Sequence, residues 1–109
     1  MSFMFLFATS FAGTGIDQWA VGNTKTLFGF LHGASKFNAD ISGWDVSSCT
    51  DFTTMFEDAA AFNVDLCSWG TKINTGAAVI SVFTGSGCPE QGNPDLSINP
   101  KGPLCFACP

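Results

Sequence analysis

Cysteine is the residue type with the most chemistry open to it in this chain. Four of the five cysteines fall in the second half of the sequence: Cys67, Cys88, Cys105 and Cys108. They could form two disulfides, hold zinc, or work as a redox centre built on the Cys105-x-x-Cys108 pair. A redox pair usually opens a helix after a strand, whereas this one stands beside two prolines, and zinc would need a second tight pair. We therefore favour two disulfides of undetermined pairing, and with them an oxidising compartment, extracellular or at the cell surface.

Oxygen ligands recur in two turn-like sequences, Asn38-x-Asp40 and Asn63-x-Asp65, which stand 25 residues apart. Calcium could bridge these four side chains. The same residue types also satisfy backbone groups at tight turns. We favour the turn interpretation because the first copy of the repeat has no matching acid. The sequence thus predicts no cofactor and no metal, with calcium on these residues as the lesser alternative.

No combination of side chains indicates catalysis. The single histidine, His32, has no serine, cysteine or carboxylate at a meaningful spacing. The Gly-x-Gly sequences at Gly13 and Gly85 lack the third glycine and the lysine of a phosphate-binding loop. We predict that the chain is not an enzyme.

Composition narrows the range of partners. The 109 residues are enough for one domain. The net charge is -5, with four lysines and no arginine, so nucleic acid is not an expected partner. Residues 1–13 are apolar but carry no basic residue before the apolar run, so they indicate neither a signal peptide nor a membrane span. We expect no membrane insertion.

A repeat must position all these residues. Trp19, Trp44 and Trp69 stand 25 residues apart, and the residues around them recur as well. Each copy reads apolar-x-x-Trp-x-apolar, with the less apolar Thr71 at the last position of the third copy. This is the leucine-rich-repeat spacing with Trp at the second Leu. The pattern indicates a short strand in which Trp44 and Val46 point into a core while Asp45 and Ser47 point out.

The stretch after each of these strands predicts a helix. After the predicted strand at Trp44 and Val46, the apolar residues Phe52, Met55, Phe56 and Ala59 follow at spacings of three, one and three, which forms an apolar helical stripe. Cys49, just before this stretch, is predicted to be a buried structural thiol. The sequence therefore predicts an α/β solenoid, a leucine-rich-repeat-like stack of about three 25-residue coils that share one core.

The predicted division of the chain follows the repeat. The coils run from about 4–30, 31–55 and 56–83, so residues 1–83 would form the solenoid. Residues 84–109 are rich in Gly, Pro and Cys and are predicted to form a disulfide-stabilised C-terminal cap, because a stack of coils otherwise leaves its core open to water.

Two runs carry a family resemblance. Phe37-Asn38-Ala39-Asp40-Ile41-Ser42-Gly43-Trp44-Asp45-Val46-Ser47 and Met55-Phe56-Glu57-Asp58-Ala59-Ala60-Ala61-Phe62-Asn63-Val64-Asp65-Leu66 resemble the BspA-like leucine-rich-repeat surface proteins of bacteria and algae. The resemblance covers roughly residues 4–83. It departs from the family pattern in the first copy and in the third, where Gly70-Thr71 replaces the Asp-Val pair. It implies a right-handed solenoid of extracellular type, often tied to adhesion.

The uncapped N-terminal coil leads to a hypothesis about function. We predict a non-enzymatic structural or assembly protein that packs through this coil onto a like chain, as a homo-oligomer or filament, or onto a larger assembly. The alternative is a recognition or adhesion module that binds protein or glycan on its strand face. The residues predicted to make these interactions are Phe3, Phe5, Phe7 and Phe11 at the open end and Asp45, Ser47 and Lys72 on the strand face.

Overall fold

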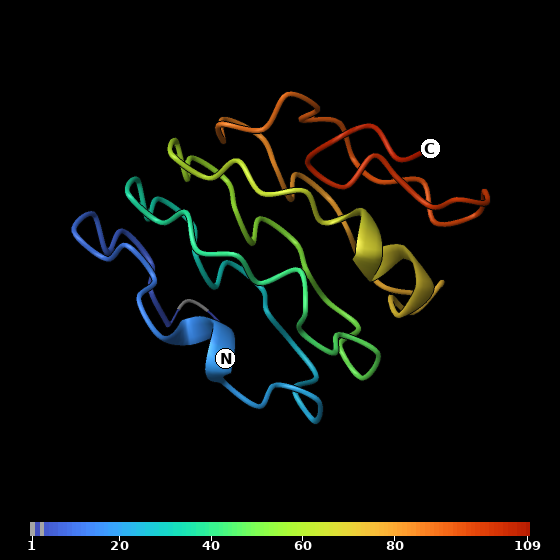
Figure 1. The fold of residues 1–109 in the computed structure, drawn as a ribbon, viewed down its shortest axis with the longest axis horizontal. Helices are drawn as coiled ribbons and strands as arrows, with labels where there is room; N and C mark the ends of the chain where they lie inside the picture. The colour runs from blue at the N-terminus through green and yellow to red at the C-terminus, as the bar shows by residue number, and fades with distance from the viewer. Residues whose placement is uncertain (1, 3) are drawn as a thin grey trace.

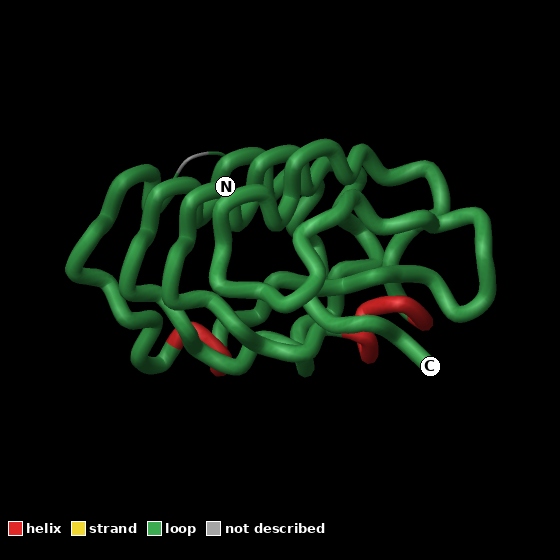
Figure 2. The backbone as a smooth tube through the Cα atoms, turned by 90° about the horizontal axis from the view of Figure 1, so that it is seen from above, coloured by secondary structure: helices red, strands yellow, loops and turns green. Residues whose placement is uncertain are grey.

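The structure is a computed structural model that describes residues 2 and 4–109. Phe3, one of the predicted interaction residues, lies outside the described residues. Regular secondary structure is sparse in the part that is described. It comprises two 3-10 helices, η1 (Ile16–Gln18) and η2 (Cys67–Thr71), drawn in red in Figure 2. The rest consists of turns, loops and isolated bridges such as Thr26 with Asp51 and Asp51 with Ala78.

The predicted α/β solenoid of leucine-rich coils is therefore wrong. Neither the strand wall nor the helical wall forms among the described residues. The segment predicted to be the third strand carries η2 instead, so the predicted strand face does not exist as a strand.

Consecutive tight turns take the place of the predicted helix. In the segment after Trp44 that was predicted to be helical, the N–H of Met55 donates to the carbonyl of Phe52 (3.0 Å), and the N–H of Ala59 donates to that of Phe56 (3.0 Å). Each bond closes a four-residue turn, not the longer ring of an α-helix. The third residue of the second turn, Asp58, has a φ of 61°, a left-handed value that an α-helix does not allow. Two such turns in succession reproduce the spacing of three, one and three, so the same side chains are buried without a helix.

Although the predicted walls are absent, the 25-residue repeat does organise the backbone. Residues of one copy donate to carbonyls of the next copy, between 24 and 26 residues later. Examples are Phe5 to Phe30 (2.9 Å), Leu31 to Met55 (2.9 Å) and Phe56 to Val82 (2.8 Å). The copies consequently lie side by side, from the blue end of the chain to the orange segment (Figure 1).

Equivalent side chains stack between these copies. The rings of Phe11 and Phe37 stand 5.9 Å apart, and those of Phe37 and Phe62 stand 5.8 Å apart. The tryptophans also link the copies, because the indole N–H of Trp44 donates to the Ile16 carbonyl (3.2 Å) and that of Trp69 donates to the Ile41 carbonyl (3.1 Å). A single apolar core therefore runs through all the copies.

The C-terminal segment covers the far end of this core. Disulfides join Cys67 to Cys108 and Cys88 to Cys105, and the N–H of Leu66 donates to the carbonyl of a buried Leu104 (3.1 Å). The red tail accordingly lies against the last copy in Figure 1. The division of the chain at residues 83 and 84 stays a prediction. No helix within the described residues is long and apolar enough to cross a membrane.

Candidate functional site

The N-terminal end of the stack exposes side chains of the kind that the other copies bury. Met4, Phe30, Met55 and Val82 occupy equivalent places, each directly before the first residue of a turn. Met4 is 53% exposed, whereas the other three are buried. Trp19 is 40% exposed, whereas Trp44 and Trp69 are buried. No described residue covers this end of the core.

Aromatic rings form the body of this N-terminal end. Phe5 and Phe11 stack at 4.2 Å between ring centroids, and Phe5 lies 5.9 Å from Trp19. Phe5 also meets Phe30 of the next copy edge-on at 5.2 Å. Phe5 and Phe11, both predicted interaction residues, are thus partly buried and anchor the exposed Trp19 to the core. We call the set Met4, Phe5, Phe11 and Trp19 the end face.

Leu6 and Phe7 lie in the turn beside the end face. Phe7 is 62% exposed and has a φ of 54°, at a turn position that Gly33 and Asp58 fill in the next two copies. Its ring lies over Gly33, where a Cβ would collide with it, and meets the His32 ring at 5.4 Å. Leu6 is 40% exposed. Because these two side chains extend the same apolar surface, we include Leu6 and Phe7 in the end face from here on.

This end also carries backbone and side-chain groups that have no hydrogen-bond partner among the described residues. In the second copy the carbonyls of Phe30 and His32 accept from Phe5 and Phe7. The matching carbonyls of the first copy, on Met4 and Leu6, accept no hydrogen bond from a described residue. The indole N–H of Trp19 likewise has no acceptor in the described part of the chain. The end therefore combines apolar area with both acceptors and a donor.

The predicted strand-face residues lie close together but already bond to their own surroundings. Oδ1 of Asp45 accepts from the N–H (3.1 Å) and the hydroxyl (2.6 Å) of Ser47. The hydroxyl bond, then the backbone bond, hold the pKa of Asp45 below its usual value of 3.8, and Lys72 lowers it slightly further. The ammonium group of Lys72 donates to the Trp44 carbonyl (3.5 Å).

The turn oxygens predicted as alternative calcium ligands are also in use. Oδ1 of Asn38 accepts from the N–H of Asn63 (2.9 Å), which joins two neighbouring copies. Oδ1 of Asp40 accepts from Ser42, and Oδ1 of Asp65 accepts from the N–H of Cys67 (2.8 Å). Each of these oxygens satisfies backbone or hydroxyl groups of a turn.

The cysteines divide between two roles. The Cys105-x-x-Cys108 pair is not joined to itself, because each member bonds to a cysteine earlier in the chain. Cys49 is a free, buried thiol whose pKa is raised, chiefly by burial. A raised pKa disfavours the thiolate and hence nucleophilic chemistry.

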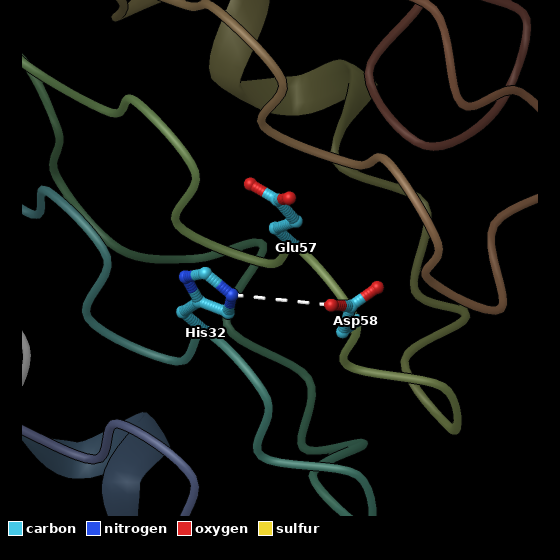
Figure 3. Close-up of side chains that lie close together, drawn as sticks. All are labelled: His32, Glu57 and Asp58. Atoms are coloured by element: carbon cyan, nitrogen blue, oxygen red, sulfur yellow. Dashed lines mark ion pairs between the residues drawn. The ribbon is translucent and has the colours of Figure 1, made fainter.

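A polar cluster that was not predicted from the sequence lies on the turn side of the stack. His32 and Glu57 occupy the same turn position in consecutive copies, and Asp58 follows Glu57. Their ligand atoms all lie within 4.8 Å of one another, with Nε2 of His32 3.9 Å from Oδ2 of Asp58 (Figure 3). The sequence does carry a signal for it, because residues 32 and 57 stand one repeat apart. That signal appears only when the histidine is compared with residues one repeat away and not with its immediate neighbours in the chain.

Comparison with known proteins gives one family. The sequence profile of the family described as "Mycoplasma protein of unknown function, DUF285" matches residues 1–88. No curated protein and no protein of solved structure matches the chain.

Proposed function

The chain belongs to the DUF285 family of Mycoplasma proteins of unknown function, and from this premise we propose that it is a non-enzymatic assembly protein. It packs through its end face onto the end face of a second copy. The observation that carries the proposal is the exposure of Met4 and Trp19 at positions whose equivalents are buried in every later copy.

The exposed apolar area supports a dimer of modest strength. Met4 is 53% exposed, Leu6 40%, Phe7 62% and Trp19 40%. At about 200 Å² for a whole side chain of this size, they leave roughly 400 Å² of apolar side chain in water. A standard interface takes about 800 Å² from each partner. These four residues would supply about half of that area, which places the interface with the small ones of weak or transient complexes.

The hydrogen-bonding groups favour a second copy as the occupant. A two-fold dimer needs a face that is complementary to itself. The end face offers the Met4 and Leu6 carbonyls as acceptors and the Trp19 indole N–H as a donor. Head-to-tail stacking would instead require the disulfide-linked tail to leave the other end of the core. The proposal is thus an end-to-end dimer and not a filament.

An extracellular setting is part of the proposal. Two disulfides are compatible with an oxidising compartment. The resemblance to BspA-like surface proteins supports the same setting. A dimer outside the cell would join two stacks into a longer rod with a disulfide-stabilised tail at each end.

Sedimentation equilibrium over a wide concentration range tests the proposal. We expect a monomer–dimer equilibrium for the unmodified protein and an at least tenfold weaker dimer for the double variant Met4→Ser, Phe7→Asn. Asn tolerates the left-handed φ of Phe7 better than most residues. The double variant Ile80→Ser, Ile98→Ser is the matched control, because Ile80 (61% exposed) and Ile98 (52% exposed) lie away from the end face.

The outcomes separate clearly. Weakening in the end-face variant and none in the control supports the proposal. A protein that stays monomeric at every concentration overturns it. Equal weakening in both double variants also overturns it, because a dimer that depends on Ile80 and Ile98 uses another surface.

A further inference from the structure

We propose that His32, Glu57 and Asp58 bind a divalent transition-metal ion, with Zn²⁺ as the best match. The site draws on two neighbouring copies of the repeat and lies outside the end face. It does not depend on the proposed dimer.

The ligand atoms are close enough to converge on one ion. Zinc binds imidazole nitrogen and carboxylate oxygen at about 2.0–2.2 Å, so the ligand atoms of a tetrahedral site lie roughly 3.4 Å from one another. Nε2 of His32 and Oδ2 of Asp58 are already 3.9 Å apart, and all three ligand atoms lie within 4.8 Å. In Figure 3 the Asp58 carboxylate faces the His32 ring, and the Glu57 side chain lies next to both of them. Side-chain rotation of Glu57 and Asp58 would close the remaining distance.

The backbone fixes the copies that carry these ligands. The N–H of Gly33 donates to the Glu57 carbonyl (2.8 Å), which locks the histidine turn to the glutamate turn. The N–H of Asp58 donates to the Thr84 carbonyl (2.9 Å). The His32 ring packs against Phe7 at 5.4 Å, and its side chain is only 22% exposed. His32 is therefore held by packing, while the partly buried Glu57 and the exposed Asp58 adjust to it.

The local charge favours a cation. The two carboxylates belong to adjacent residues, Glu57 and Asp58. Among the described residues, the ion pair at this cluster joins His32 to Asp58. No lysine in the described residues forms an ion pair with Glu57 or Asp58. A divalent ion would neutralise both carboxylates at once, over distances at which their mutual repulsion is appreciable.

The donor set selects the metal. Calcium and magnesium prefer sites made only of oxygen. An imidazole nitrogen suits zinc and its neighbours in the transition series, and carboxylates complete the zinc ligand set. Three protein ligands leave a fourth position for water. The structure therefore assigns this cluster to Zn²⁺ ahead of Ca²⁺.

Isothermal titration calorimetry with Zn²⁺ alone, at neutral pH, tests the site. The oxidised, untagged full chain is used, and a thiol assay first shows that no thiol beyond Cys49 is free, so that sulfur does not compete for zinc. We expect one ion per chain with micromolar affinity. His32→Ala and Glu57→Gln should each weaken binding at least tenfold. Asp17→Asn is the matched control, because it removes one exposed carboxylate from η1, away from the cluster.

A parallel NMR titration identifies the ligands. Zinc should shift the imidazole signals of His32 and the backbone amides of Glu57 and Asp58 in the unmodified protein. Glu57→Gln keeps the size of a partly buried side chain and removes only its charge, so it reports on the site even if His32→Ala fails to fold. Three results overturn the proposal: no zinc binding, zinc binding that neither variant weakens, or Ca²⁺ binding as tight as Zn²⁺.

Discussion

The two ends of the repeat stack contain the same types of residue in opposite environments. At the N-terminal end Met4 and Trp19 remain in contact with water, whereas at the other end Trp69 and Val82 are buried. The difference comes from the segment that lies against each end of the stack and not from the repeat itself. At the sealed end the tail supplies Leu104 and two disulfides, and at the open end no described residue has that role. The position of a residue within the repeat therefore determines whether its side chain faces the core. The position of its copy within the stack determines whether that side chain is covered by a neighbouring segment.

Removing the disulfides should give the largest effect on this contrast. The Cys67–Cys108 bond spans 41 residues, and the double variant Cys67→Ser, Cys108→Ser should lose about 4 kcal/mol of unfolding free energy on the chain-entropy estimate. Cys88–Cys105 spans 17 residues and should contribute about 3 kcal/mol. Urea unfolding followed by tryptophan fluorescence measures both losses. Because the two loops overlap, the effects should not add in the quadruple variant.

The same variants test what seals the end. Opening Cys67–Cys108 should raise hydrogen exchange at Leu66, whose N–H bonds to the tail, and should leave exchange at Phe5 and Phe7 unchanged. Equal acceleration at both ends would show that the stack responds as one unit and that the comparison of its ends has no energetic basis.

Equivalent tryptophan substitutions should give the next largest effect. Trp69→Phe removes the indole bond to the Ile41 carbonyl (3.1 Å) and leaves a cavity in the core. We expect a loss of about 2–3 kcal/mol from the two causes together. Trp19→Phe removes a partly exposed ring with no indole acceptor among the described residues, so its loss should stay below about 1 kcal/mol. Chemical denaturation of the two variants in parallel measures this difference.

Trp44→Phe serves as the internal control for that pair. Trp44 is buried and donates to the Ile16 carbonyl (3.2 Å), so its substitution should resemble Trp69→Phe although it lies in the middle of the stack. If Trp19→Phe proved as costly as the other two, the end face would have to be covered in solution, as the proposed dimer would cover it. Repeating the measurement at protein concentrations too low for the dimer tests this: the cost of Trp19→Phe should then fall if the dimer covers Trp19.

The 25-residue repeat and most of the buried positions could be predicted from the sequence. Trp44, Val46, Met55 and Phe56 were expected in the core and are buried. Burial follows from the apolar spacing whatever backbone supports it, because hydrophobic burial is not directional. The spacing does not specify that backbone. A helix and two linked turns present the same apolar residues, so the choice of an α/β solenoid was wrong.

The choice between helix and turns depends on φ values that the sequence shows only in part. In the turns that end at Phe30 and Ala34, Gly29 and Gly33 stand at the left-handed positions, with φ of 61° and 72°, and glycine there is a usable signal. One repeat later, Thr54 and Asp58 adopt the same conformation in the turns that end at Met55 and Ala59. A β-branched threonine is not expected there, and aspartate adopts it only occasionally. The exposure of Trp19 and the cluster around His32 were missed for another reason. Both depend on which copies are neighbours, and this requires the repeat register to be combined with the three-dimensional stacking.

The smallest expected effect concerns the pKa values of two aspartates, one in the repeats and one in the tail, which should respond alike. Asp40, within the repeats, and Asp95, within the tail, each accept from the hydroxyl (2.6 Å) and the N–H of a serine two residues later. The hydroxyl bond and then the backbone bond lower the pKa of both aspartates from the usual 3.8. A depressed pKa in the folded state stabilises the protein at pH values above the unfolded pKa, and this contribution is lost as the pH falls below 3.8 through the folded pKa.

Carboxyl-carbon NMR titration should show the pKa of Asp40 rising toward 3.8 in Ser42→Ala and that of Asp95 rising toward 3.8 in Ser97→Ala. Since each turn is closed by its own residues, the two shifts should be similar despite the different surroundings. A much larger shift at Asp95 would mean that the tail, and not the local turn, sets the field around the carboxylate, and the contrast between the two ends would then extend to electrostatics as well as burial.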